Sequence, residues 1–173
     1  WEPTHEDILG PFFVSGAPFR GKVTRPFEPG ELLVIRGRVW GHDTKKPIAN
    51  AVLDVWQADA KGRYDMTHPS RPPSWSEFRN RIRLVTDETG FYEYETIRPA
   101  AYRVGTSVRP AHIHYLVQAP GYQRLITQLY FKGDPNIARD RWARQSNLLV
   151  IPLNKKVSGG SYQLATFDIV LVK

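Results

Sequence analysis

Two histidines separated by one residue lie in the segment RPAHIHY, residues 109–115. If this segment is a β-strand, its side chains alternate between two faces, so His112 and His114 point in the same direction. A neutral imidazole offers one nitrogen lone pair, and two imidazoles on one face can bind a metal ion. The pair alone leaves two readings open: a metal site, or two histidines on a solvated face.

Two tyrosines occupy unusual positions. Tyr64 follows AKGR, where a turn after a strand usually carries small or charged residues, and Tyr102 follows the turn at Pro99, ten residues before His112. Each tyrosine alone is typical of a packed aromatic residue, whereas the set of two tyrosines and two histidines indicates a metal site. Ionising a phenol at pH 7 costs about 4 kcal/mol per group, because its pKa is near 10. A hard, highly charged cation offsets this cost best, so the set favours Fe(III); zinc or calcium would more naturally recruit carboxylates and carbonyls.

The chain contains no cysteine. This excludes disulfides, thiolate nucleophiles, iron–sulfur clusters and cysteine-ligated zinc sites. The net charge of +7 is carried by dispersed Lys and Arg residues, and no basic run has the interleaved aromatic residues of a nucleic-acid module. We therefore expect no nucleic-acid partner, and note that such a charge also attracts a small anionic substrate.

No apolar run is long enough to span a bilayer, so we expect a soluble protein with no membrane partner. A cytoplasmic location is expected. A secreted location would follow only if a leader had been removed before Trp1.

Short runs rich in Val, Ile, Leu, Tyr and Phe must position the candidate residues. Their regular spacing between turn signals predicts an antiparallel sandwich or barrel. The runs cover residues 31–40, 50–59, 81–87, 90–97, 111–119, 124–131, 147–153 and 162–172. Only residues 137–147 have a sequence pattern typical of a helix. We expect an all-β, single-domain antiparallel β-sandwich over residues 1–173, with long connecting loops and at most one short helix. Residues 1–30 would be an N-terminal arm and residues 31–173 the core.

Two other functions are compatible with this scaffold. Transthyretin-like β-sandwich modules also combine a strand, a hairpin, a strand and an Asp-x-x-Gly turn, as at Asp87 and Gly90. Such a module would bind carbohydrate or protein and be catalytically silent. A hydrolase that holds zinc on the two histidines is the other alternative.

Four segments resemble the intradiol ring-cleavage dioxygenases, most closely the subunits of protocatechuate 3,4-dioxygenase. They are LDVWQADAKGRYD, TDETGFYEYETIRPAAY, RPAHIHYLVQAPGYQRLITQLYFKGDP and ATFDIVLV. The resemblance runs from the ILGPFF segment to the last residue. It implies an enzyme that cleaves catechol-type rings with O2 to cis,cis-muconate-type diacids. Its partners would be a small aromatic diol and O2, and a homo-oligomer is compatible with it.

The resemblance also implies that Tyr64, Tyr102, His112 and His114 bind one non-haem ferric ion per chain. Tyr102 would be the axial tyrosine that leaves the metal when substrate binds, and Tyr64 the equatorial tyrosinate that stays. His114 would be the axial histidine and His112 the equatorial one. Arg109 matches a residue beside the reacting ring.

Further matches concern the surroundings of the ring. Gln128 would act together with the arginine, and Trp56 would line the site. Gly10 and Pro11 match a pocket edge that a neighbouring subunit can supply in the family. Val104 stands where an aromatic residue is expected, which predicts a roomier pocket.

Residues 66–81 are expected to form a long loop over the site. Its arginines, Arg71, Arg79 and Arg81, could meet a substrate carboxylate or could be solvated. The substrate stays open among protocatechuate, catechol and other substituted catechols.

Overall fold

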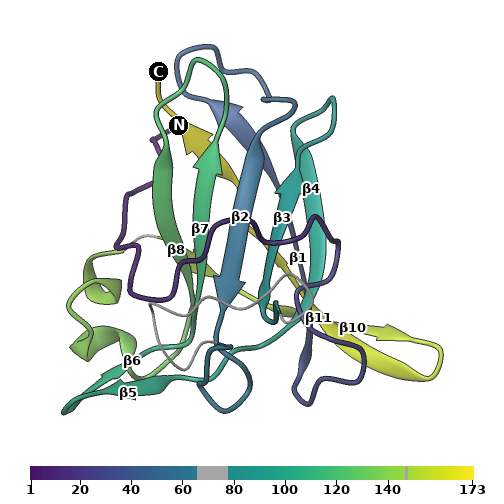
Figure 1. The fold of residues 1–173 in the computed structure, drawn as a ribbon, viewed down its shortest axis with the longest axis vertical. Helices are drawn as coiled ribbons and strands as arrows, with labels where there is room; N and C mark the ends of the chain where they lie inside the picture. The colour runs from purple at the N-terminus through teal and green to yellow at the C-terminus, as the bar shows by residue number, and fades with distance from the viewer. Residues whose placement is uncertain (66–77, 147) are drawn as a thin grey trace.

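The structure, a computed structural model, describes residues 1–65, 78–146 and 148–173. Two five-stranded sheets lie against each other, joined by long loops (Figure 1). The predicted all-β sandwich is confirmed. No helix in the described ranges is long and apolar enough to cross a membrane.

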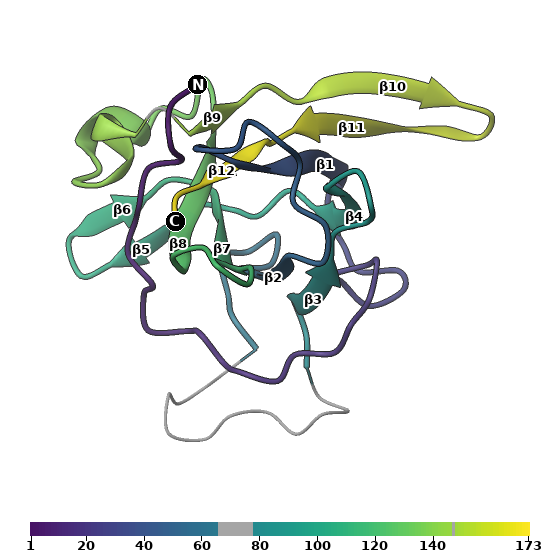
Figure 2. The same ribbon diagram turned by 90° about the horizontal axis from the view of Figure 1, so that it is seen from above.

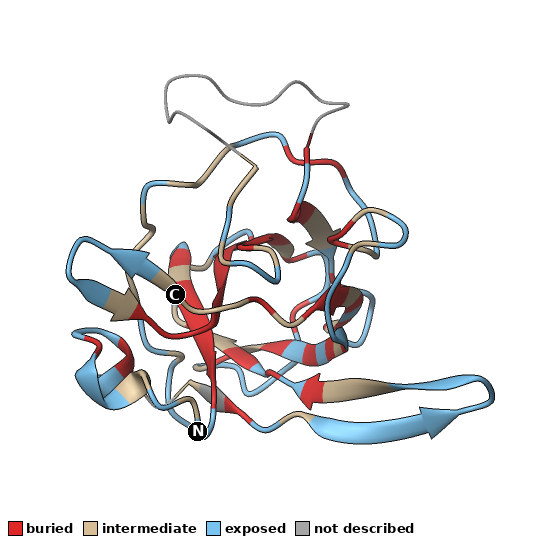
Figure 3. Cartoon of the chain, turned by 90° about the horizontal axis from the view of Figure 1, so that it is seen from below, coloured by how far each residue is buried: buried red, intermediate tan, exposed pale blue. Residues whose placement is uncertain are grey.

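The first sheet is built around β1 (Leu32–Gly41). It pairs antiparallel with β4 (Phe91–Ile97) and parallel with β11 (Gly160–Thr166) and β12 (Ile169–Leu171). β10 (Leu153–Val157) forms a hairpin with β11 and is an edge strand. This sheet is therefore mixed rather than purely antiparallel. Its hairpin extends away from the body of the protein and is largely exposed (Figures 2 and 3).

The second sheet carries most of the candidate residues. Its strand order is β3 (Arg81–Val85), β2 (Val52–Gln57), β7 (His112–Gln118), β8 (Leu125–Phe131) and β9 (Leu149–Val150). All neighbours in it are antiparallel except β8 and β9.

A small hairpin that the sequence pattern does not indicate follows β4. It consists of β5 (Tyr102–Val104) and β6 (Ser107–Arg109). Gly105, with φ +60°, allows the tight turn between them. Tyr102 and Arg109 are opposite each other in this hairpin, which brings two candidate residues together.

Residues 137–146 form two short 3₁₀ helices instead of one continuous helix. These are η2 (Ile137–Arg139) and η3 (Ala143–Gln145). Between them, Oδ1 of Asp140 accepts hydrogen bonds from the backbone N–H groups of Trp142 (3.0 Å) and Ala143 (2.7 Å). A side chain that binds the backbone in this way competes with helix continuation, which explains the interruption.

Apolar side chains from both sheets fill the space between them. On β7, Ile113, Tyr115 and Val117 face this core, and the two histidines face the opposite side. Burial of a side chain as large as Ile or Val contributes about 1.5–3 kcal/mol. The alternation therefore fixes which face of β7 is available for chemistry.

The first residues of the chain cross the outer face of the second sheet (Figure 1). The backbone N–H of Asp7 donates to Ile126 O (2.9 Å), and the side chain of Thr127 donates to His5 O (2.7 Å). The side-chain nitrogen of Gln128 donates to Ile8 O (2.8 Å). These three bonds attach the arm to β8 beside the candidate site.

Candidate functional site

The register of the second sheet places a row of side chains on its outer face. Trp56 on β2, His114 on β7 and Gln128 on β8 are direct cross-strand neighbours. His112, two residues before His114, lies opposite Tyr130 of β8. Because side chains at i and i+2 share a face, all five belong to one surface.

The two imidazoles face each other at the centre of this surface. Their Nε2 atoms are 3.2 Å apart, and His112 Nδ1 lies 2.7 Å from the carbonyl oxygen of Pro110. If Nδ1 donates its hydrogen to that carbonyl, as the contact favours, Nε2 of His112 carries the lone pair. Burial and then the nearby Arg109 charge lower the pKa of His112 to about 4, and burial lowers the pKa of His114 well below its ordinary value. Both rings are therefore neutral at pH 7, the form that ligates metals.

The two tyrosines approach the same point. The Tyr102 hydroxyl lies 3.3 Å from Nε2 of His112. The Tyr64 ring lies edge-on to the Tyr102 ring, with centroids 5.7 Å apart, and 6.4 Å from the His114 ring. Burial raises the pKa of both phenols, that of Tyr64 most strongly. Without a nearby cation both would stay protonated at neutral pH.

The donor set fits a ferric ion. The Tyr64 hydroxyl is buried without a hydrogen-bond partner, and such groups are rare because they are costly. Two neutral imidazoles and two phenols that need a strong cation to ionise are compatible with a hard trivalent metal. Elsewhere in the described ranges, no cluster of three or more His, Asp or Glu side chains offers another metal site.

Local structure explains how Tyr64 reaches the site. Gly62, with φ +77°, turns the chain after β2, and a Cβ there would lie 2.9 Å from Ala101 O and from the Tyr102 Cβ. Only glycine fits this close approach. The Tyr64 ring then stacks on Phe12 of the arm, with centroids 4.1 Å apart.

Arg109 is held beside the histidines by three side chains. Its Nε donates to Asp140 (3.0 Å), and its Nη2 donates to Gln128 Oε1 (3.2 Å) and to the Tyr130 hydroxyl (3.0 Å). Burial alone would lower the pKa of Arg109, but Tyr130 and Asp140 raise it above its ordinary value. The guanidinium is therefore a permanent positive charge with a fixed direction.

Two more side chains complete this network. The Tyr130 hydroxyl donates to Oδ2 of Asp7 (2.7 Å), and the Trp142 ring covers the Arg109 guanidinium at 4.8 Å. Burial raises the pKa of Asp7, although the Tyr130 hydrogen bond partly opposes it.

The sequence did not reveal Asp7, Tyr130 or Asp140. The only sequence signal for Asp140 is its turn-forming residue type, and nothing pairs it with an arginine 31 residues away.

A cavity of about 1130 Å³ opens onto this surface. Tyr64, Tyr102, Arg109 and His114 line it, as do the predicted pocket residues Gly10, Pro11 and Val104. Gly10 and Pro11 come from the arm of the same chain, and a Cβ on Gly10 would lie 3.3 Å from His114. Val104 is 55% exposed on β5.

Trp56, predicted to line the site, is not one of the described residues that line the cavity. It is 1% exposed, and its indole stacks nearly parallel to the His114 ring at 4.8 Å. It supports the orientation of that imidazole.

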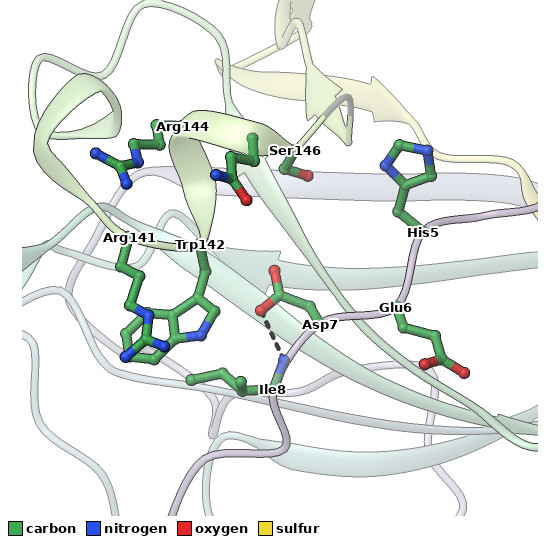
Figure 4. A pocket seen from close by; sticks show the side chains of 9 residues that line it. His5, Glu6, Asp7, Ile8, Arg141, Trp142, Arg144 and Ser146 are labelled. Atoms are coloured by element: carbon green, nitrogen blue, oxygen red, sulfur yellow. Dashed lines mark hydrogen bonds between the residues drawn. The ribbon is translucent and has the colours of Figure 1, made fainter.

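Figure 4 shows a second cavity, of about 870 Å³, whose lining shares Ile8, Arg141 and Trp142 with the first. Asp7 lines it and joins it to the arginine network through Tyr130.

Of the loop arginines, Arg81 differs from both alternatives of the expectation, whereas the exposed Arg79 is compatible with a solvated residue. Arg81 is 2% exposed and forms an ion pair with Asp65, and its Nη1 donates to Phe12 O (2.5 Å). It is therefore neither solvated nor exposed to a substrate. Arg79 is exposed, and its backbone N–H donates to Asp65 (3.2 Å). Arg71 and most of residues 66–81 lie outside the described residues.

Three comparisons with known proteins agree. A family model described as Dioxygenase matches residues 8–173. Chlorocatechol 1,2-dioxygenase of Rhodococcus opacus is 38% identical over 190 residues, which cover 97% of this chain and 72% of that protein. The solved structure of catechol 1,2-dioxygenase from Acinetobacter sp. ADP1, inhibited by bound mercury, matches with a TM-score of 0.85 and 30% identity over 97% of this chain. This chain spans 62% of the length of that one.

A third relative has nearly the same extent. It is the dioxygenase domain of a dioxygenase–carbohydrate-binding protein fusion from Streptomyces sp. SirexAA-E. It is 34% identical, with a TM-score of 0.81 and 99% coverage of both chains. The particular closeness to protocatechuate 3,4-dioxygenase subunits is not addressed by these three relatives and stays a prediction.

Proposed function

Because the chain belongs to the intradiol ring-cleavage dioxygenase family, we propose that it cleaves catechol-type rings with O2, using one non-haem ferric ion per chain. The proposed ligands are Tyr64, Tyr102, His112 and His114. The observation that carries the proposal is the convergence of these side chains, with two neutral imidazole nitrogens 3.2 Å apart and a buried, unpartnered Tyr64 hydroxyl. Both atoms of O2 would enter the product, a cis,cis-muconate-type diacid.

A bound ferric ion would supply a chelation site for the two diol oxygens and draw electron density from the ring, which makes a ring carbon reactive towards O2. Both diol protons must leave before chelation. As a tyrosinate, Tyr102 would be suited to accept one, because it lines the cavity and its hydroxyl lies 3.3 Å from Nε2 of His112, where the ring would bind.

Arg109 would stabilise negative charge that develops on the ring. Its side chain is buried, lines the cavity and is held from three directions, so it does not need to reorient during the reaction. Gln128 holds one of its nitrogens and is itself held by the arm through Ile8 O. The arm thus contributes indirectly to the position of the charge.

The first test is a visible spectrum and a metal analysis of the purified protein. Tyrosinate bound to Fe(III) gives a charge-transfer band, so we expect a coloured protein with iron near one per chain. Adding catechol, and then protocatechuate, without oxygen should shift this band, and admitting O2 should bleach it. A colourless protein that takes up no iron would support a silent binding module. A protein that contains zinc and consumes no O2 when catechol is added would support a hydrolase.

A further inference from the structure

Many of the residues that line the large cavity carry a positive charge. Six of its described lining residues are cationic and one, Asp140, is acidic. Asp140 is buried against Arg109, and Arg63 pairs with Asp59 at 3.1 Å. Four cations remain, here called the cationic rim: Lys61, Arg103, Arg139 and Arg141.

The cationic rim is not compensated by acidic side chains of the described chain. All four residues are exposed, and none forms an ion pair with a described residue. They come from three separate segments: the loop after β2, strand β5, and the turns around η2 and η3. Like charges gathered from three segments around one opening repel one another and attract an anion.

Apolar side chains make up part of the cavity lining, here called the apolar wall; they include Phe12, Val104, Val108 and Trp142. Arg109 and His114 also line the cavity and are buried, so they mark its buried end, where Tyr64 and Tyr102 approach the histidines. The cavity thus combines buried polar donors, apolar side chains and exposed cations.

The size of the cavity indicates a ligand larger than an unsubstituted ring. At about 1130 Å³ it exceeds the range of roughly 300–1,000 Å³ that is usual for ligand pockets. A catechol held by the buried donors would leave much of the apolar wall uncovered.

We propose that the cationic rim binds an anionic group, such as a carboxylate, at the end of a side chain on the catechol ring. This inference rests on the proposed function, because the diol must occupy the buried end. A carboxylate attached directly to the ring would lie below the exposed rim. A side chain of a few carbons would follow the apolar wall and bring its charge to the cations.

The test compares 3-(3,4-dihydroxyphenyl)propanoate with its methyl ester. The two share the ring and the spacer, and the saturated chain isolates the ring electronically from the charge. We expect kcat/KM to be about tenfold higher for the acid, equivalent to about 1.4 kcal/mol. The preference should shrink as salt is raised from about 0.05 to 0.5 M, because exposed charges are screened.

A double variant, Arg103→Gln with Arg139→Gln, should reduce the acid-to-ester ratio of kcat/KM to near one. The matched control is Lys155→Gln with Lys156→Gln, which removes the same charge from the exposed edge strand β10. The control should keep the ratio of the unmodified protein. If it lost the ratio equally, net charge rather than the rim would be responsible, and the inference would be overturned.

Two further outcomes separate this inference from the proposed function. Turnover of catechol and ester with no preference for the acid would overturn the rim site and leave the dioxygenase intact. A higher kcat/KM for protocatechuate than for its methyl ester, with no such difference between the propanoate and its methyl ester, would place the anion beside the ring and overturn the inference. No turnover of any catechol by the iron-loaded protein would refute the proposed function itself.

Discussion

Replacing Asp140 by Asn should separate the positioning of Arg109 from the folding of the turn around it. Oδ1 of Asp140 accepts two backbone hydrogen bonds, from Trp142 and Ala143, and Oδ2 accepts from Arg109 Nε at 3.0 Å. Asn keeps an oxygen for the backbone bonds. In the place of Oδ2 it puts an NH2 group, which cannot accept a hydrogen bond from the guanidinium.

The expected loss follows from burial. The side chains of Arg109 and Asp140 are 6% and 4% exposed, and removing one partner of such a pair costs about 3–5 kcal/mol. For a domain of this size that corresponds to a fall in Tm of roughly 6–20 °C. Because Arg109 can then turn, we expect kcat to fall about 10–100-fold, or about 1.4–2.7 kcal/mol in the activation barrier.

The assay is steady-state kinetics with catechol at 25 °C, together with thermal unfolding. A positioning role predicts that kcat falls while KM changes little and the visible band stays. Asp87→Asn is the matched control, because Asp87 accepts the same kind of turn bonds from Thr89 and Phe91 and has no comparable buried cation partner. If Asp140→Asn lowered Tm and left kcat unchanged, the pair would be structural only, and our reasoning on Arg109 would be refuted.

Three other predictions concern single residues. Tyr64→Phe should weaken the visible band of the iron-loaded protein, whereas Arg109→Ala should keep the band and lose turnover; a full-strength band in Tyr64→Phe would show that Tyr64 is not a ligand. Gly62→Ala should lower Tm more than Gly159→Ala. Both glycines have positive φ, which costs an alanine about 1–2 kcal/mol at either position, but only a Cβ at residue 62 would also contact Ala101 and Tyr102. Equal losses of Tm would argue against close packing around Gly62. Burial raises the pKa of Asp54, although Arg83 partly opposes it, so the folded protein binds the proton more tightly than the unfolded chain. As pH falls from neutral through that raised pKa to about 3.8, the unmodified protein should therefore gain stability relative to Asp54→Asn, as chemical denaturation at each pH would measure; a parallel pH dependence of the two proteins would contradict this.

The strands and the central histidine pair were predictable because they depend on short-range patterns. Alternation on residues 111–119 places His112 and His114 on one face whatever lies next to the strand. The arginine network was not predictable, because Asp7, Arg109, Tyr130 and Asp140 meet only through tertiary contacts. No local periodicity encodes an ion pair between residues 31 positions apart.

Two features of the fold also could not be predicted from the hydrophobic pattern of the sequence. Strands β5 and β6 have three residues each, too few for alternation to be visible. The apolar run at residues 162–172 predicts a strand but not its partner, and β11 and β12 in fact run parallel to β1. Hydrophobic alternation specifies which face of a strand is buried. Whether the strand runs parallel or antiparallel to its neighbour depends on how the connecting chain returns to the sheet.

The pairing of β1 with the last strands has a consequence for how the protein forms in the cell. The backbone N–H of Arg38 donates to Asp168 at 2.8 Å, a contact between residues 130 positions apart. During synthesis, β2, β3, β7 and β8 can pair soon after they leave the ribosome, while one edge of β1 must wait for almost the whole chain. Contacts of such high sequence separation slow folding and leave a strand edge open to other chains. Until β11 and β12 have been synthesised, this edge of β1 therefore lacks its partner strands.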